Sequence, residues 1–302
     1  MEKDSILHLI TAAKNASPFD VNMAIDAGFD QVIPYTNVAL NEVVGLTQDA
    51  IFSRSPSGIK RESIFIGGRD IDLAMDMLRA AEKSMFSPFE ISVLADPSGA
   101  FTTAAAMVAK VELQLKKHFH TDLAGKRVAI FGATGPVGGC VAVITANLGA
   151  EAILVGHKTV EEVREKADGY NQRYGTRIGF ADGTNENAKQ AIVNTADVVL
   201  CAAAAGIRVV TIQQIAESKT LKVIADVNAV APTGAEGVDV MADGVMIEGT
   251  SVEGTQVVGI GALAIGNLKY TTQHNLLKQM LAADKPCYLE FMAAFEMARS
   301  LS

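Results

Sequence analysis

The sequence predicts an α/β protein with two domains, the second of which is a doubly wound, Rossmann-type domain. Strand-like and helix-like segments alternate along almost the whole chain, which is typical of βαβ units. The length of 302 residues allows two cores of ordinary size. A glycine-rich turn, Gly132-Ala-Thr-Gly135-Pro-Val-Gly138, separates an apolar strand-like run from a helical pattern. This order of strand, turn and helix is the start of a nucleotide-binding unit.

The first domain is expected to comprise residues 1–122. Its predicted strands are 5–11, 31–35, 51–54, 63–66 and 90–94. Its predicted helices are 21–28, 40–47, 70–86 and 102–117. This half has no glycine turn of the phosphate-binding type, so we expect it to be the substrate domain.

The second domain is expected to comprise residues 123–267. Its predicted strands are 127–131, 152–155, 178–180, 198–201, 222–226 and 244–247, and its predicted helices are 138–148, 160–173, 186–194 and 211–218. Residues 259–266 are predicted to be a glycine-rich loop, followed by helices at 268–281 and 288–299. We expect residues 268–302 to return to the first domain.

The glycine turn predicts a dinucleotide site, because a helix that starts after such a turn presents backbone N–H groups to a pyrophosphate. The spacing is GxxGxxG rather than GxGxxG, and a simple packing turn is the alternative. The residues expected to contact the cofactor here are Gly132, Thr134, Gly135, Pro136, Val137 and Gly138.

The end of the second predicted strand of this domain indicates which dinucleotide binds. NAD-selective domains usually carry an acid there for the ribose 2′-hydroxyl, whereas this chain has His157 and Lys158. Two basic side chains suit a 2′-phosphate, so NADP is favoured and NAD remains possible. The alternative is that both side chains are merely solvated. Farther along, Ala203, Gly206 and Asn228 follow two later strands and are expected to border the cofactor.

Composition excludes several other classes of protein. A net charge of −8 argues against nucleic-acid binding, and no apolar run approaches the roughly 20 residues that span a bilayer. The N-terminus lacks a signal-peptide pattern. Three distant cysteines and five histidines have neither disulfide nor metal-ligand spacing, so no metal is expected. We therefore expect a cytoplasmic protein that binds neither nucleic acid nor membranes.

Seven segments carry a family resemblance: residues 17–28 (SPFDVNMAIDAG), 33–38, 64–70, 96–106 (DPSGAFTTAAA), 132–138, 226–232 (DVNAVAP) and 259–270 (GIGALAIGNLKY). Together they resemble the NAD(P)-dependent methylene-tetrahydromethanopterin dehydrogenases of methylotrophic bacteria over essentially the whole chain. The resemblance implies two α/β domains with a cleft between them. It also implies hydride transfer from 5,10-methylene-tetrahydromethanopterin to NADP+ or NAD+ in one-carbon (formaldehyde) oxidation. A homo-oligomer is expected as well.

The resemblance also implies a pterin site. Its expected catalytic residues are Lys269 and Asp96, and its expected substrate-binding residues are Asp20, Tyr35, Thr102, Thr103 and Asn267. Helix capping by Asp20 and Asp96, and a solvated Lys269, are the simpler interpretations. Three alternative functions stay open: a shikimate-type or quinone reductase on the same plan, a methylene-tetrahydrofolate dehydrogenase, and an NADP-sensing binding protein.

Overall fold

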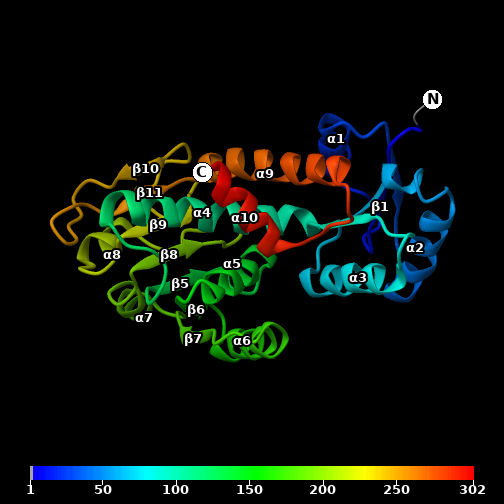
Figure 1. Ribbon diagram of the computed structural model, residues 1–302. Coiled ribbons are helices and arrows are strands. Elements are labelled where there is room, and N and C mark those ends of the chain that lie inside the picture. Colours follow the sequence, from blue (N-terminus) through cyan, green and yellow to red (C-terminus); the bar gives the residue numbers. More distant parts are fainter. Residues whose placement is uncertain (1–2) are drawn as a thin grey trace. The chain divides into compact units, whose positions relative to one another are not determined.

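The computed structural model describes residues 3–302 and divides the chain into two compact units (Figure 1). The first unit holds the chain up to Thr102 together with Tyr270–Met297, and the second holds Thr103–Lys269 and Ala298–Ser300. Three long helices contribute to both units: α4 (Ala100–Phe119), α9 (Ala262–Ala282) and α10 (Phe291–Leu301). The α/β fold class is confirmed, and Tyr270–Met297 of the C-terminal segment belongs to the first unit.

The first unit is built on a five-stranded, wholly parallel sheet in the order β12-β4-β3-β1-β2. Its strands are β1 (Ile6–Ile10), β2 (Gln31–Tyr35), β3 (Glu62–Ile66), β4 (Ser92–Ala95) and β12 (Tyr288–Leu289). Its helices are α1 (Pro18–Ala27), α2 (Val43–Phe52) and α3 (Ile71–Ser84). The order in which successive strands are added reverses between β1 and β3. Sheets of this kind form a crevice at their carboxyl edge at such a point.

One predicted strand of this unit is wrong. Residues 51–54 do not form a strand, because Ile51 and Phe52 are the last residues of α2. The buried positions of α2 are Val43, Thr47, Ala50 and Ile51, which follow the helical repeat and lie on one side of the helix. Burial of that side outweighs the strand preference of Ile and Phe.

The second unit has a seven-stranded sheet in the order β10-β11-β9-β8-β5-β6-β7. Its strands are β5 (Arg127–Phe131), β6 (Glu151–Gly156), β7 (Gly179–Asp182), β8 (Val198–Cys201), β9 (Val223–Asp226), β10 (Asp243–Met246) and β11 (Val258–Ile260). Its own helices are α5 (Pro136–Asn147), α6 (Val160–Tyr174), α7 (Glu186–Val193) and α8 (Ile212–Glu217). Apart from the antiparallel edge strand β10, this is the doubly wound order of a Rossmann-type domain.

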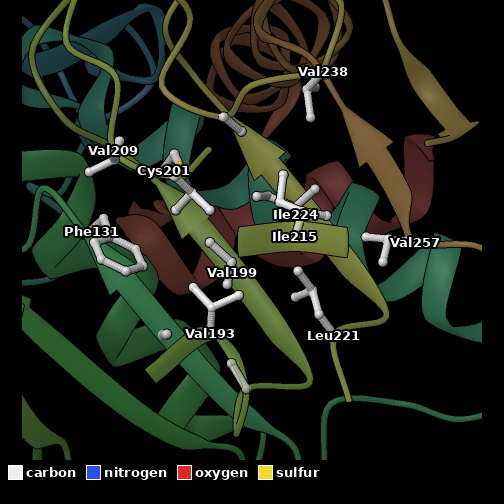
Figure 2. Close-up of a cluster of buried hydrophobic side chains, with 14 of the residues drawn as sticks. Phe131, Val193, Val199, Cys201, Val209, Ile215, Leu221, Ile224, Val238 and Val257 are labelled. Carbon is white, nitrogen blue, oxygen red and sulfur yellow. The ribbon is translucent and has the colours of Figure 1, made fainter. Parts of the chain in front are cut away.

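Strands β8 and β9 of the second unit are buried along their whole length, which accounts for their continuous apolar sequences. Figure 2 shows part of the core on one side of this sheet, where Phe131, Val199, Cys201 and Ile224 meet Ile215 of α8. Helices α5 and α6 pack beside β6. A rigid, close-packed core of this kind fixes where the strand ends and their loops lie.

Two C-terminal expectations need correction. The loop expected at 259–266 is in fact the end of β11 followed by α9, which already begins at Ala262. The helix expected at 288–299 starts later: Tyr288 and Leu289 form β12, which pairs with Val93 and Leu94 of β4, and α10 begins at Phe291. A two-residue strand is too short to leave a periodic signal in the sequence.

Candidate active site

The glycine turn lies at the carboxyl end of β5, beside the point where the strand order of the second sheet reverses. Gly132 has a φ of +79°, and a Cβ there would overlap the backbone of Ala202 after β8. A Cβ on Gly138 would overlap the carbonyl oxygen of Gly132, since α5 starts directly against the end of β5. These two glycines therefore allow the close packing of the turn itself.

Gly135 differs from the other two glycines. Its φ is −79°, and the nearest atom to a Cβ would be the carbonyl oxygen of Gly132 at 3.3 Å. It is the N-cap of α5 without a side chain to cap the helix, and Pro136 at the first helical position has no N–H. The remaining N–H groups of the first turn, starting at Val137, are those that a helix leaves for an anion. Thr134 lies half-buried in the same turn.

The loops after β8 and β9 are joined by one side chain. Asn228 Oδ1 accepts hydrogen bonds from the N–H groups of Gly206 (3.2 Å) and Val230 (2.9 Å). Its Nδ2 donates to the carbonyl of Pro232 at 3.0 Å. Asn228 thus sets the course of the loop that contains Ala203 and Gly206. It is 4% exposed, so its side chain serves to position backbone.

Beneath this loop, Asp226 is a buried carboxyl group. Its oxygens accept from the N–H groups of Asn228 (2.9 Å) and Ala235 (3.0 Å). Burial raises the pKa of Asp226 despite these bonds, and together with Asp226 it raises the pKa of the Cys201 thiol well above its ordinary value. Cys201 is therefore a packed thiol rather than a nucleophile.

At the end of β6, His157 and Lys158 are both exposed. They precede Thr159, whose side chain caps α6 by accepting from the N–H of Glu162. The neighbouring strand β7 places Asp182 in register with Gly156. Asp182 could not be identified from sequence, because only strand pairing brings it to this tip.

In the first unit, Asp96 lies at the carboxyl end of β4 and is fully buried. Its Oδ1 accepts from the N–H groups of Phe101 (2.9 Å) and Thr102 (3.2 Å), and its Oδ2 accepts from the Thr102 hydroxyl (2.6 Å). Asp96 and Thr102 therefore belong together, at the N-terminus of α4, with Thr103 next along the helix. The negative charge also stabilises the positive end of the helix dipole.

Asp20 is 4% exposed on α1 and accepts a hydrogen bond from Nε2 of Gln273, a fully buried residue of α9, at 3.0 Å. Beside it, Phe19 (46% exposed) and Tyr270 (45% exposed) stand edge to face with ring centroids 6.4 Å apart. A buried carboxylate beside two exposed aromatic rings is an arrangement that suits a flat, polar heterocycle. Phe19, Tyr270 and Gln273 are not among the residues predicted from sequence. The available signal was an aromatic residue next to a predicted polar one, Phe19 beside Asp20 and Tyr270 beside Lys269.

Tyr35 lies elsewhere in the first unit. Its hydroxyl is 3.1 Å from His8 Nδ1, and His8 Nε2 is 3.1 Å from Glu62 Oε2. Burial and the charge of Glu62 raise the pKa of Tyr35. The ring lines a cavity of about 240 Å³ that is also lined by Leu46 and Asp49 of α2.

The structure does not bring the predicted pterin residues Asp20 and Tyr35 together. Helix α1 and the part of α9 in this unit lie on one face of the sheet, and α2 and α3 lie on the other (Figure 1). Asp20 belongs to the first face and Tyr35 to the second. Asn267 and Lys269 are in the part of α9 that belongs to the second unit; Asn267 is exposed and Lys269 is half-buried.

Within residues 3–302, no group of three or more His, Cys, Asp or Glu side chains is arranged to hold a metal ion. No helix in the same range is long and apolar enough to cross a membrane.

Comparison with known proteins gives matches along the chain. A family model described as methylene-tetrahydromethanopterin dehydrogenase, N-terminal, matches residues 18–98. The NAD(P)-dependent methylenetetrahydromethanopterin dehydrogenase of Methylorubrum extorquens is 49% identical over 294 residues, which cover 97% of both chains. The protein named bifunctional protein MdtA from the same organism is 31% identical over 228 residues, covering 76% of this chain and 77% of that one.

Solved structures share the fold at low sequence identity. An ornithine carbamoyltransferase from Pyrococcus furiosus has a TM-score of 0.55 and 11% identity, covering 94% of this chain and 87% of its own. Quinate dehydrogenase from Corynebacterium glutamicum, in complex with NAD, has a TM-score of 0.50 and 11% identity, covering 98% and 99%. Because a transferase and a dehydrogenase resemble the chain equally well, these likenesses establish the fold alone.

Proposed function

The chain belongs to the NAD(P)-dependent methylenetetrahydromethanopterin dehydrogenase family, and from this premise we propose that it oxidises 5,10-methylene-tetrahydromethanopterin. A hydride leaves the methylene carbon for NADP+ or NAD+, and 5,10-methenyl-tetrahydromethanopterin remains. The observation that carries this proposal is the 49% identity to a relative of that name over 97% of both chains.

The reaction makes modest demands on the protein. The lone pairs of the two nitrogens beside the methylene carbon drive the hydride out, so no general base is required. The product is a cation that these nitrogens stabilise. The protein must hold the donor carbon in place, exclude water and offer negative charge to the developing cation. The absence of a nucleophilic triad from the predicted residues agrees with these demands.

The nucleotide proposal is supported by the fit of the glycine turn. A missing Cβ at Gly135 and the N–H groups of Val137 and Gly138, which the start of α5 leaves without a helical partner, suit a pyrophosphate. NAD(P)+ supplies the hydride acceptor at C4 of its nicotinamide when it is bound. We assign the pyrophosphate to the Gly132–Gly138 turn, the 2′ end to His157 and Lys158, and the ribose of the nicotinamide half to the loop positioned by Asn228.

The pterin proposal rests on the first unit and on α9. We assign the ring to Phe19, Asp20 and Tyr270, where a buried carboxylate and exposed aromatic rings lie together. Lys269 and Asn267 are proposed to donate hydrogen bonds to it. Asp96 is proposed to act on the cation through its charge, which burial leaves poorly screened, while Thr102 holds that carboxylate and Thr103 extends the polar start of α4. Tyr35 lies on the other face of the sheet from the residues assigned to the ring. We therefore assign it to a part of the substrate outside the pterin ring.

The homo-oligomer and the cytoplasmic location remain part of the proposal. Ile33 of the edge strand β2 is 41% exposed, and Leu40, Val44 and Phe52 are exposed in the segment that follows. Such side chains favour burial against another subunit. Light scattering on the purified protein tests this part, and a monomer over a wide concentration range would contradict it.

Turnover tests the central proposal. Purified protein is mixed with 5,10-methylene-tetrahydromethanopterin and NADP+, and the absorbance of the reduced nicotinamide is followed. Parallel reactions contain NAD+ or the tetrahydrofolate analogue, and two further reactions combine NADPH with 3-dehydroshikimate or with a quinone. We expect reduction of the dinucleotide with the methanopterin substrate. Turnover confined to a carbonyl substrate would replace the proposal with the reductase alternative.

A further inference from the structure

The tip of β6 carries charges of both signs. His157 and Lys158 follow the strand directly and are exposed. Asp182 ends the neighbouring strand β7 in register with Gly156, and the N–H of Gly183 donates to the carbonyl of Gly156 at 2.9 Å. Since neighbouring strands lie about 4.8 Å apart, Asp182 begins one strand spacing from the residue that precedes His157.

The Asp182 carboxylate is held in place by its own loop. Its Oδ1 accepts from the N–H of Thr184 at 2.9 Å, which closes a tight turn. The next residue, Gly183, has no room for a side chain, because a Cβ would overlap Val155 of β6. Hydrogen bonds from Thr184 lower the pKa of Asp182, so the group is ionised at neutral pH.

We propose that Asp182 sets how strongly this site prefers a 2′-phosphate over a 2′-hydroxyl. Its negative charge repels the 2′-phosphate, whereas Lys158 and His157 attract it. Because the two effects partly cancel, both NADP and NAD can bind. The inference rests on the proposed nucleotide site and adds a residue that decides between the two dinucleotides. In NAD-selective domains an acid at the end of the strand equivalent to β6 favours NAD. Here Asp182, at the end of β7, has that effect.

The expected size follows from Coulomb's law. A carboxylate and a 2′-phosphate of about two negative charges, roughly 8 Å apart in water, repel enough to change a dissociation constant between about two- and sixfold. Salt screens exposed charges, so the effect should fade at about 1 M salt, where the Debye length is about 3 Å.

Asp182→Asn is the decisive variant. Asparagine keeps the oxygen that accepts from Thr184, so the turn is retained while the charge is lost. Asp168→Asn is the matched control, because it removes the same charge at a different place. Asp168 is exposed on α6, eight residues beyond the start of that helix. Dissociation constants are measured for adenosine 2′,5′-bisphosphate and adenosine 5′-monophosphate at low ionic strength and at about 1 M salt.

We expect Asp182→Asn to raise the preference for the bisphosphate between about two- and sixfold at low salt, and Asp168→Asn to leave it unchanged. An equal change for both nucleotides, or no change, would overturn the proposal. Binding of these fragments does not depend on the pterin reaction. Failure of the wild type to bind either fragment would instead reject the nucleotide site itself.

Discussion

At the scale of single residues, the three glycines of the turn after β5 have separable roles. Gly132 and Gly138 are required by the packing of the chain on itself, whereas a Cβ on Gly135 would make one tight contact, 3.3 Å from the carbonyl oxygen of Gly132, and no overlap. In Gly132→Ala, the positive φ and the overlap with Ala202 should cost about 2 kcal/mol or more of unfolding free energy. In Gly135→Ala, stability should change by less than about 1 kcal/mol, while affinity for NADP+ falls at least about tenfold.

Denaturant unfolding and NADP+ titration of these two variants provide the measurements. Loss of stability in Gly135→Ala, with affinity unchanged, would show that this glycine also serves packing and that the pyrophosphate binds elsewhere.

In the proposed nucleotide site, Lys158 is the residue on which we expect the preference for a 2′-phosphate to depend most. Lys158→Glu removes an attraction and adds a repulsion, so we expect KM for NADP+ to rise by about tenfold or more while KM for NAD+ changes little. Lys166→Glu, an exposed change of the same sign on α6, is the control. Steady-state kinetics with both dinucleotides measure the effect. An equal rise for NADP+ and NAD+ would remove Lys158 from the 2′ site.

Lys269 is the proposed hydrogen-bond donor to the pterin. Lys269→Ala should lower kcat/KM for the pterin by about a hundredfold, the amount expected when a charged donor is lost, and leave NADP+ affinity in place. Lys278→Ala, an exposed lysine farther along α9, is the comparison. If Lys269→Ala instead weakened NADP+ binding, its proposed role would be wrong.

At the scale of elements, α10 is joined to α4 by a bidentate ion pair. Arg299 Nε and Nη2 lie 2.7 and 2.6 Å from the two carboxylate oxygens of Glu112, whose side chain is 6% exposed. The hydrogen bond and charge of Arg299 lower the pKa of Glu112 below its ordinary value of 4.5. Because the folded-state pKa is the lower one, this contribution is complete above the unfolded value and is lost as pH falls through the folded value.

Arg299→Met should therefore cost about 1–3 kcal/mol of unfolding free energy at neutral pH, and less as the pH drops below about 4. Lys116→Met removes the exposed second partner of Glu112 and should cost about 0.5 kcal/mol or less. Urea unfolding across this pH range measures both variants. A cost for Arg299→Met that did not change with pH would mean that the arginine stabilises α10 by packing rather than by charge.

The elements that sequence could predict are those with long, regular patterns. The central strands and all four helices between β5 and β9 appear where their periodicity places them, although their ends differ by one or two residues. The errors lie where the sequence lacks a local signal. Residues 51–54 combine a β-like composition with a buried helical stripe, and β12 is only two residues long. Proline inside β2 is tolerated because Pro34 lies in a strand that pairs only with β1.

The same distinction holds for the candidate site. The glycine turn could be predicted because its residues are contiguous and its chemistry depends on backbone. Asp182 and Gln273 could not, because each acquires its neighbour through strand pairing or helix packing: Asp182 beside Gly156, and Gln273 bonded to Asp20 across 253 residues. Asp20 itself was predicted as a ligand-binding residue, and the structure adds the buried amide that fixes it.

At the scale of the whole molecule, the chain contains two sheets of mainly parallel strands, and in each sheet the strand order reverses at one point. Such a sheet gathers loops and helix starts at its carboxyl edge, and each unit has its candidate residues there: the glycine turn in one, and Asp96 with the start of α4 in the other. The proposed function assigns the dinucleotide to residues of the second sheet's edge and the pterin to a separate set of residues.

The most direct test of the account follows the hydrogen atom itself. The methylene carbon of 5,10-methylene-tetrahydromethanopterin is labelled with deuterium, and the protein is supplied with NADP+ in ordinary water. We expect the deuterium to appear at C4 of NADPH without dilution by solvent, because the transfer is a direct hydride step that needs no protein base. Reduced cofactor that carried hydrogen from the solvent, or no reduced cofactor although NADP+ is bound, would contradict it.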